Sequence, residues 1–214
     1  MTWWSYGDIV DALHLAMRRR ADEQDEEQAV FGLDAMTELE LHPVLAEGLE
    51  AAGYGVHREV RYPGRREADR LSEGERCDLV LALDGRPLAS EAKRRSLFDP
   101  EDALPLDDAF WLEVKTVAQH LPEGPNANYS GQLLEPIRRD VRKLAMDRQI
   151  LHAGVLIVLF TAESRVAEND LRIWQERCLD QGLSISAAYR RELPIADRHG
   201  NAWCSLSLVP VHHL

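Results

Sequence analysis

The chain has 214 residues, of which 45% are hydrophobic, so it is long enough to bury one sizeable core. Its 25 Lys and Arg against 37 Asp and Glu give a formal net charge of -12, which argues against a protein that grips nucleic acid over its whole surface but allows a local basic groove. The three cysteines are widely separated, which excludes a paired zinc or disulfide pattern and favours a reducing, cytoplasmic location. No apolar run reaches the roughly 18 residues of a membrane span, so we expect no membrane association.

An N-terminal helix is the first predicted element. Apolar residues recur at helical spacing over residues 6–20. The highly charged stretch 18–28 that follows is typical of a solvated helix face or a short linker. We therefore divide the chain into an N-terminal helical segment, 1–33, and a main domain, 34–214.

A second helix is expected over 34–52, ahead of the first strand. Its beginning has a capping-box pattern at Thr37 and Glu40. Pro43 predicts either a kink or a late start, because proline is accommodated easily only in the first helical turn. Alternation of apolar and polar residues over 56–62 then predicts a strand.

The next two predicted strands carry charged residues among apolar neighbours. Asp78 stands at the mouth of the apolar run 76–83, and Glu113 and Lys115 lie within the run 110–117. Successive side chains of a strand alternate between faces, so Glu113 and Lys115 point the same way. Neither charge favours burial in a sheet, so the pair indicates a site on which Asp78 can converge.

The rest of the chain predicts alternating helices and strands. An irregular insertion over 86–109 precedes the strand with Glu113, and the elements after that strand are a basic helix over 131–146, a buried strand over 154–160, a helix over 167–181 and a strand over 202–209. This order indicates an α/β fold with a central mixed β-sheet flanked by helices.

The three charged residues suggest a chemistry. Two carboxylates at strand ends can hold a hard dication such as Mg²⁺, which prefers oxygen ligands and keeps several waters. Such a cation lowers the pKa of a water that it binds, and a nearby ammonium favours the hydroxide. Asp78, Glu113 and Lys115 could thus generate a nucleophile and neutralise charge on a phosphodiester.

Asp78 followed by Glu113-Val114-Lys115, after a helix that bears glutamates, resembles the PD-(D/E)XK, or restriction-endonuclease-like, nuclease superfamily. The resemblance covers residues 34–160 and departs from the motif at Cys77, where proline often stands. It implies a restriction-endonuclease-like fold, Mg²⁺ as the cofactor with Mn²⁺ as a substitute, and a helix glutamate that completes the metal site.

Four glutamates compete for that last role: Glu38, Glu40, Glu47 and Glu50. Glu38 lies three and seven residues before Leu41 and Leu45, so it borders the stripe that faces the sheet. We therefore prefer Glu38 and keep Glu40 as the second candidate. His42, four residues after Glu38, can point the same way.

Several other residues compete for parts of the site. Glu91 and Lys93 repeat the spacing of Glu113 and Lys115, but their polar surroundings cannot bury a strand well. Gln119 and Gln132 could orient a water or phosphate, although we favour ordinary solvated amides for both.

Arg139 and Lys143 are the candidate contacts to nucleic acid. They lie four residues apart on one face of the basic helix and could contact the DNA backbone. A salt-bridged surface with Asp140 and Asp147 explains them equally well.

We predict a metal-dependent nuclease that hydrolyses phosphodiester bonds, with DNA as the preferred substrate and RNA as an alternative. Glu38, Asp78 and Glu113 would bind Mg²⁺, and Lys115 would orient or help to activate the attacking water. The resemblance makes a homodimer an expectation. The rival hypothesis is a non-catalytic module of the same fold that serves as a subunit of a larger complex, since the acidic surface and Trp3-Trp4 favour partner proteins.

Overall fold

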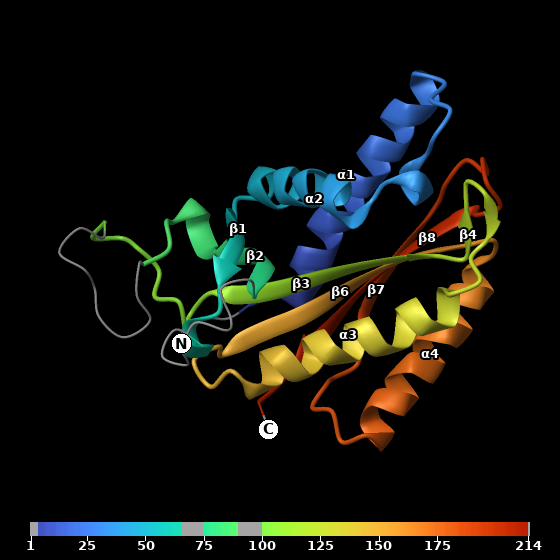
Figure 1. Cartoon of the computed structure of the whole chain (residues 1–214). Coiled ribbons are helices and arrows are strands. Elements are labelled where there is room, and N and C mark those ends of the chain that lie inside the picture. Colours follow the sequence, from blue (N-terminus) through green and yellow to red (C-terminus); the bar gives the residue numbers. More distant parts are fainter. Residues whose placement is uncertain (1–3, 66–74, 90–99, 214) are drawn as a thin grey trace.

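One six-stranded mixed β-sheet, with helices on both faces, organises the molecule (Figure 1). The computed structural model describes residues 4–65, 75–89 and 100–213. The helices are α1 (Tyr6–Glu26), α2 (Glu38–Ala51), α3 (Tyr129–Met146) and α4 (Ser164–Asp180). Figure 1 shows α1 and α2 on one face of the sheet and α3 and α4 on the other. The predicted α/β class with a central mixed sheet flanked by helices is thus confirmed.

The sheet has the strand order β1-β2-β3-β6-β8-β7. Its strands are β1 (Gly55–Arg61), β2 (Arg76–Ala82), β3 (Phe110–Ala118), β6 (His152–Thr161), β7 (Tyr189–Pro194) and β8 (Trp203–Val211). The first three strands pair antiparallel, β3 and β6 pair parallel, and β8 is antiparallel to both β6 and β7. A parallel pair requires a long crossover, which α3 supplies between β3 and β6.

Helix α1 continues through most of the charged stretch, which is the first of the two predicted alternatives. It continues to Glu26, so most of the charged stretch is helical rather than a linker. Its apolar stripe, which includes Ile9, Leu13 and Met17, is completely buried and belongs to the same hydrophobic core as the sheet. The N-terminal helix therefore packs as part of the sheet's own core.

Helix α2 begins later than predicted, but Pro43 still lies inside the helix, beyond its first turn, so the late start does not accommodate the proline. Its first residue is Glu38, while 33–35 form a separate 3₁₀ turn. The predicted capping box is present: the Thr37 amide donates to Glu40 Oε2 at 2.7 Å, and the Glu40 amide donates to Thr37 Oγ1 at 3.3 Å. This cap fixes Glu38 at the start of the helix.

Two parts of the sheet structure are absent from the sequence prediction. Strand β7 is one, because its residues are mostly polar and it lies at the edge of the sheet. The other is the small hairpin of β4 (His120–Leu121) and β5 (Gly124–Pro125). Two-residue strands have no periodicity to detect.

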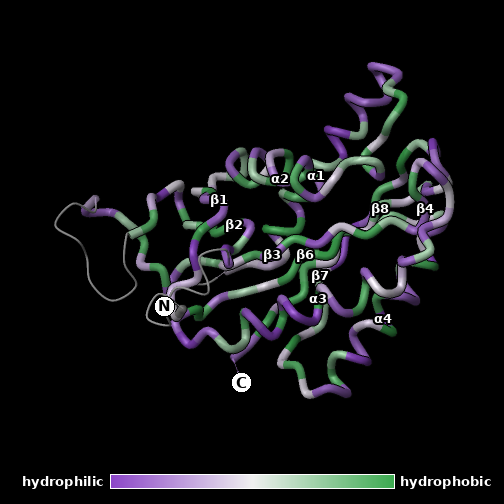
Figure 2. The backbone as a smooth tube through the Cα atoms, viewed as in Figure 1, coloured by the Kyte–Doolittle hydropathy of each residue, from purple (hydrophilic) through white to green (hydrophobic). Residues whose placement is uncertain are grey.

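The core lies where the sheet meets the helices. Every residue of β6 after His152 is buried. Figure 2 shows hydrophobic residues, in green, in the middle of the sheet and hydrophilic residues, in purple, at the far end of α1. Within the described part of the chain, no helix combines the length and the apolar character needed to cross a membrane.

Candidate active site

The strands β2 and β3 separate where their charged residues begin. Their ladder pairs Leu79 with Leu112 and ends there, one step before the facing positions Asp78 and Glu113. Asp78 Oδ2 instead accepts a hydrogen bond from the Val114 amide at 2.8 Å. The carboxylate of Asp78 thus replaces a strand partner, and this holds it between the two strands.

The backbone on the other side of Asp78 is strained. Glu59 of β1, which faces Asp78, has φ 54°, and the β1–β2 ladder skips this one position. A residue other than glycine adopts this left-handed conformation at a cost of about 1–3 kcal/mol, and such strain concentrates at functional sites. The Glu59 carbonyl is held by Arg76, whose guanidinium donates to it at 2.9 Å.

Asp78 and Glu113 form a buried carboxylate pair. Glu113 is only 2% exposed, and a side-chain hydrogen bond joins it to Asp78. Burial, together with the charges of Asp78 and Asp140, raises the pKa of Glu113 to about 7. Burial also raises the pKa of Asp78, while the hydrogen bond from Glu113 opposes that rise. Facing like charges on neighbouring strands repel, so the pair favours a state in which the two carboxyl groups are not both ionised.

Lys115 lies at the centre of the carboxylates. Its Nζ is 3.0 Å from Glu38 Oε1, 3.4 Å from Asp140 Oδ2 and 3.9 Å from Asp78 Oδ2. Burial alone would lower the pKa of Lys115, but the three carboxylates outweigh it and raise the pKa above its ordinary value. The Glu38 carboxylate also accepts from the Thr116 amide at 3.3 Å, so α2 is tied directly to β3.

Residues of α3 and of the segment after β1 complete the cluster. Lys143 Nζ lies 2.8 Å from Glu113 Oε1 and 3.2 Å from Asp140 Oδ1. The Tyr62 hydroxyl donates a short hydrogen bond to Glu113 Oε1, and the Lys143 ammonium lies 5.1 Å from the centre of the Tyr62 ring. Neither Tyr62 nor Asp140 was predicted to belong to the site. The available signal for Asp140 was its position within the buried stripe of α3.

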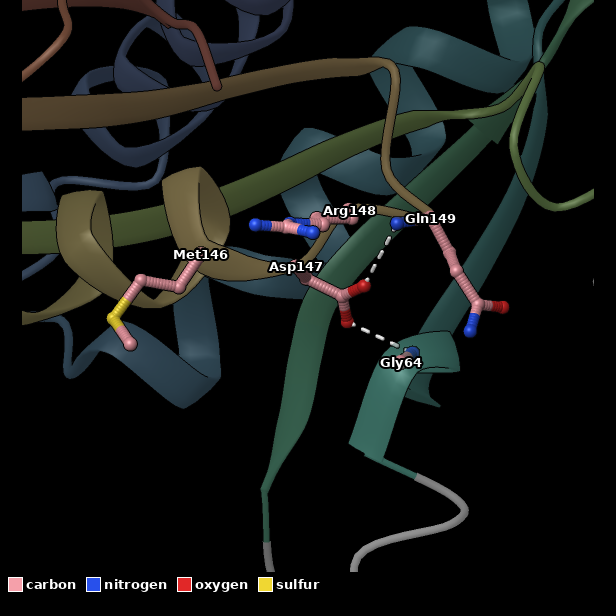
Figure 3. A pocket seen from close by; sticks show the side chains of 5 residues that line it. All are labelled: Gly64, Met146, Asp147, Arg148 and Gln149. Atoms are coloured by element: carbon pink, nitrogen blue, oxygen red, sulfur yellow. Dashed lines mark hydrogen bonds between the residues drawn. The ribbon is translucent and has the colours of Figure 1, made fainter. Parts of the chain in front are cut away.

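The segment that follows Tyr62 is tied to the end of α3 through Gly64 and Asp147 (Figure 3). Asp147 Oδ2 accepts from the Gly64 amide at 3.0 Å, and Asp147 Oδ1 accepts from the Gln149 amide at 3.1 Å. These three residues, with Met146 and Arg148, line a hollow of about 300 Å³. A side chain at Gly64 would collide with the Asp147 carboxylate, so only glycine allows this close approach.

The cluster is suited to a dication. It contains four carboxylates, on Glu38, Asp78, Glu113 and Asp140, and two ammonium groups, on Lys115 and Lys143. These six side chains leave two negative charges uncompensated when all are ionised. Ligand atoms of Glu38, His42 and Asp78 also lie within 4.8 Å of one another. Oxygen donors and an excess of negative charge are what a divalent cation requires.

The structure distinguishes between the candidate glutamates. Glu38 reaches the cluster, whereas the Glu40 carboxylate is used in the helix cap, and its hydrogen bonds to Thr37 lower its pKa. Glu91 and Lys93 lie outside the described residues.

The two glutamines have structural partners. Gln119 Oε1 accepts from the Ala162 amide at 3.0 Å, and Gln132 Oε1 accepts from Asn126 Nδ2 at 2.8 Å. Gln119 thus links the end of β3 to the end of β6, and Gln132 links α3 to the preceding loop. The amides therefore hold loops and strand ends together.

The two predicted DNA contacts differ in position. Arg139 is exposed on α3, whereas the side chain of Lys143 is 15% exposed and is paired within the cluster. Lys143 does pair with Asp140, but within the buried cluster and not on a surface, and Asp147 instead accepts from the backbone amides of Gly64 and Gln149. Contact of either residue with DNA stays a prediction.

The fold and the cluster define an α/β protein with a buried carboxylate and lysine centre at the opening between two strands. Comparison with protein-family models, with curated proteins and with solved structures found no match. The resemblance to PD-(D/E)XK nucleases therefore depends on the residues described above.

Proposed function

We propose that the protein is a metal-dependent nuclease that hydrolyses phosphodiester bonds, with DNA as its substrate. The observation that carries this proposal is the convergence of Glu38 on α2 and Asp78 on β2 upon Lys115 of β3, with Glu113 of β3 against Asp78. Buried charged clusters of this kind are expensive and concentrate at functional sites.

The topology around the cluster supports the same proposal. The chain runs from α2 through β1, β2 and β3 to α3 and then to β6, which lies parallel to β3. A helix before the carboxylates and a helix and strand after them are the arrangement that the PD-(D/E)XK resemblance implies. The proposal thus draws on both the motif and its surroundings.

The cation would be held by the oxygen donors of Glu38, Asp78 and Glu113. When bound, a dication supplies Lewis-acid activation of water and of the phosphate. Glu113 must release its proton to bind the cation, because a carboxylate ligates in its ionised form. Tyr62 and Lys143 orient Glu113 for this role through their contacts with Oε1.

Lys115 would act directly on the reacting groups. Its ammonium donates hydrogen bonds and keeps its charge, so it can orient the attacking water and stabilise the negative charge that develops on the phosphate. Asp140 lies against Lys115 and Lys143 and so positions both ammonium groups. Water attack forms a bond from the water oxygen to phosphorus as the bond from phosphorus to one bridging oxygen breaks. The water gives up one proton, and the departing oxygen takes up one.

The stability cost of the cluster argues against the rival non-catalytic module. Replacing a buried ion network by well-packed apolar residues is often neutral or stabilising, by about 1–4 kcal/mol. A module that never used the chemistry would have no need for six charged side chains between its strands and helices.

A cleavage assay tests the proposal. Supercoiled, linear and single-stranded DNA, with RNA as a further substrate, would be incubated with the native chain in Mg²⁺ or Mn²⁺. We expect Lys115→Ala to lower cleavage by at least about 100-fold, as loss of a donor to a developing charge does. Arg165→Ala, which removes an exposed ion pair on α4, should cleave like the native chain.

Two outcomes would count against the nuclease. Full activity of Lys115→Ala, with circular dichroism unchanged, would exclude the proposed role of the cluster. If the native chain cuts nothing and gains no thermal stability from either metal, the non-catalytic module becomes the better interpretation, because a ligand that binds the native state must stabilise it.

A further inference from the structure

The imidazole of His42 is the most unusual polar group beside the cluster. The residue is 1% exposed, and neither ring nitrogen has a hydrogen-bond partner among the described residues. A buried donor or acceptor without a partner costs about 1–3 kcal/mol. A leucine at this helix position would avoid that cost, so packing alone does not explain a histidine.

His42 is placed where it can share a ligand with the carboxylates. It lies four residues after Glu38, so both side chains project from the same face of α2. Ligand atoms of His42, Glu38 and Asp78 lie within 4.8 Å of one another. The charged side chains that act on the ring come from three elements, namely Glu38 on α2, Arg58 and Glu59 on β1, and Lys115 on β3.

We propose that Glu38, His42 and Asp78 form a mixed nitrogen and oxygen site that selects a first-row transition-metal dication, for which Mn²⁺ serves as the spectroscopic probe, over Mg²⁺. The metal selectivity does not depend on the proposed function. Only its role does, because the selected cation would be the one that the nuclease uses.

The donor set explains the selectivity. Mg²⁺ takes oxygen ligands almost exclusively and keeps several waters. An imidazole nitrogen adds little to its binding, whereas nitrogen ligands increase the affinity of first-row transition metals. The two carboxylates attract any dication, and His42 would favour a transition-metal dication over Mg²⁺.

Electron-spin-echo spectroscopy of the native chain loaded with Mn²⁺ tests this directly. Mn²⁺ is paramagnetic, so an imidazole nitrogen bound to it modulates the echo, and a carboxylate oxygen does not. We expect nitrogen modulation in the native chain and its loss in His42→Gln. His14→Gln is the matched control, because His14 lies on α1 and its Nε2 is 3.2 Å from the Glu192 carbonyl.

Thermal shifts with each metal provide a second readout. We expect the preference of the native chain for Mn²⁺ over Mg²⁺ to fall by about tenfold or more in His42→Gln, as expected for a lost metal ligand. Should this variant fail to fold, native protein with histidine labelled by the heavier nitrogen isotope would still give an altered modulation pattern if a histidine is bound.

The outcomes separate this inference from the proposed function. Absence of nitrogen modulation from the native chain, or its persistence in His42→Gln, would overturn the inference, as would a failure of the native chain to bind Mn²⁺. Cleavage in Mg²⁺ by His42→Gln would leave the nuclease proposal intact in either case. Nitrogen modulation without cleavage on any substrate would support the metal site and reject the nuclease.

Discussion

Strands β3 and β6 lie side by side in the centre of the sheet, yet they bury different kinds of side chain. They pair parallel along their length, with Glu113 next to Val155 and Lys115 next to Ile157. Both Val155 and Ile157 are fully buried in an apolar strand, whereas Glu113 is almost as buried and is charged or protonated. At one height in the sheet, apolar residues fill one strand and a charged cluster occupies the next.

The comparison shows what a buried charge requires. Lys115 is tolerated because α2, β2 and α3 each contribute a carboxylate to it, through Glu38, Asp78 and Asp140. The described residues include no such set around β6. The buried charges of β3 are therefore stabilised by partners from other elements. The sheet does not accept buried charges at every position.

The largest expected effect comes from transferring a charge to the apolar strand. Val155→Glu would place a second carboxylate next to Glu113 in the apolar strand β6, and an uncompensated buried charge costs about 3–5 kcal/mol. Urea denaturation at pH 8 would measure the free energy of unfolding, with Val155→Ala as the control for lost packing. Equal stability of the two variants would show that β6 can accept a charge and would undermine the comparison.

The reverse change, Glu113→Gln, should remove a pH-dependent loss of stability. The pKa of Glu113 in the folded chain is about 7, against an ordinary value of 4.5. The native state thus binds this proton more tightly than the unfolded chain. Its contribution is complete below pH 4.5 and is lost as the pH rises through about 7. Since one pKa unit corresponds to about 1.4 kcal/mol, the loss amounts to about 3 kcal/mol.

Urea denaturation from pH 5 to pH 8 in EDTA would test this second prediction. Relative to Glu113→Gln, the native chain should lose stability over this range, because the variant cannot ionise at this position. Parallel curves for the two proteins would mean that Glu113 is ionised throughout, and that Lys143 stabilises its charge more strongly than burial and the neighbouring carboxylates oppose it.

The strands that carry the cluster could be predicted from sequence because their signals are local. Alternation in β3 placed Glu113 and Lys115 on one face, and helical phase favoured Glu38 over Glu40. The cap on α2 explains that choice, since Glu40 is hydrogen-bonded to Thr37. Local periodicity therefore identified the strand that carries Glu113 and Lys115, and the helix that carries Glu38, separately.

The partners of these charges could not be predicted in the same way. Tyr62 and Glu113 are 51 residues apart, and their contact depends on how the segment after β1 is tied to the end of α3. Asp140 interrupts a buried stripe, but which charges it meets depends on the packing of α3 against β3. Strand β7 was missed because an exposed, polar edge strand has little apolar alternation.

The smallest expected effect separates the two basic residues of α3. Arg139 is exposed and free to meet a phosphate, so Arg139→Ala should reduce the slope of log affinity against log salt by about 1. Lys143 is paired with Glu113 and Asp140, so Lys143→Gln should leave the slope unchanged. Fluorescence anisotropy with a DNA duplex in EDTA, over a series of salt concentrations, would measure both slopes. A lower slope in both variants would show that Lys143 leaves its carboxylates to contact DNA, and the cluster would then be rearranged by its substrate.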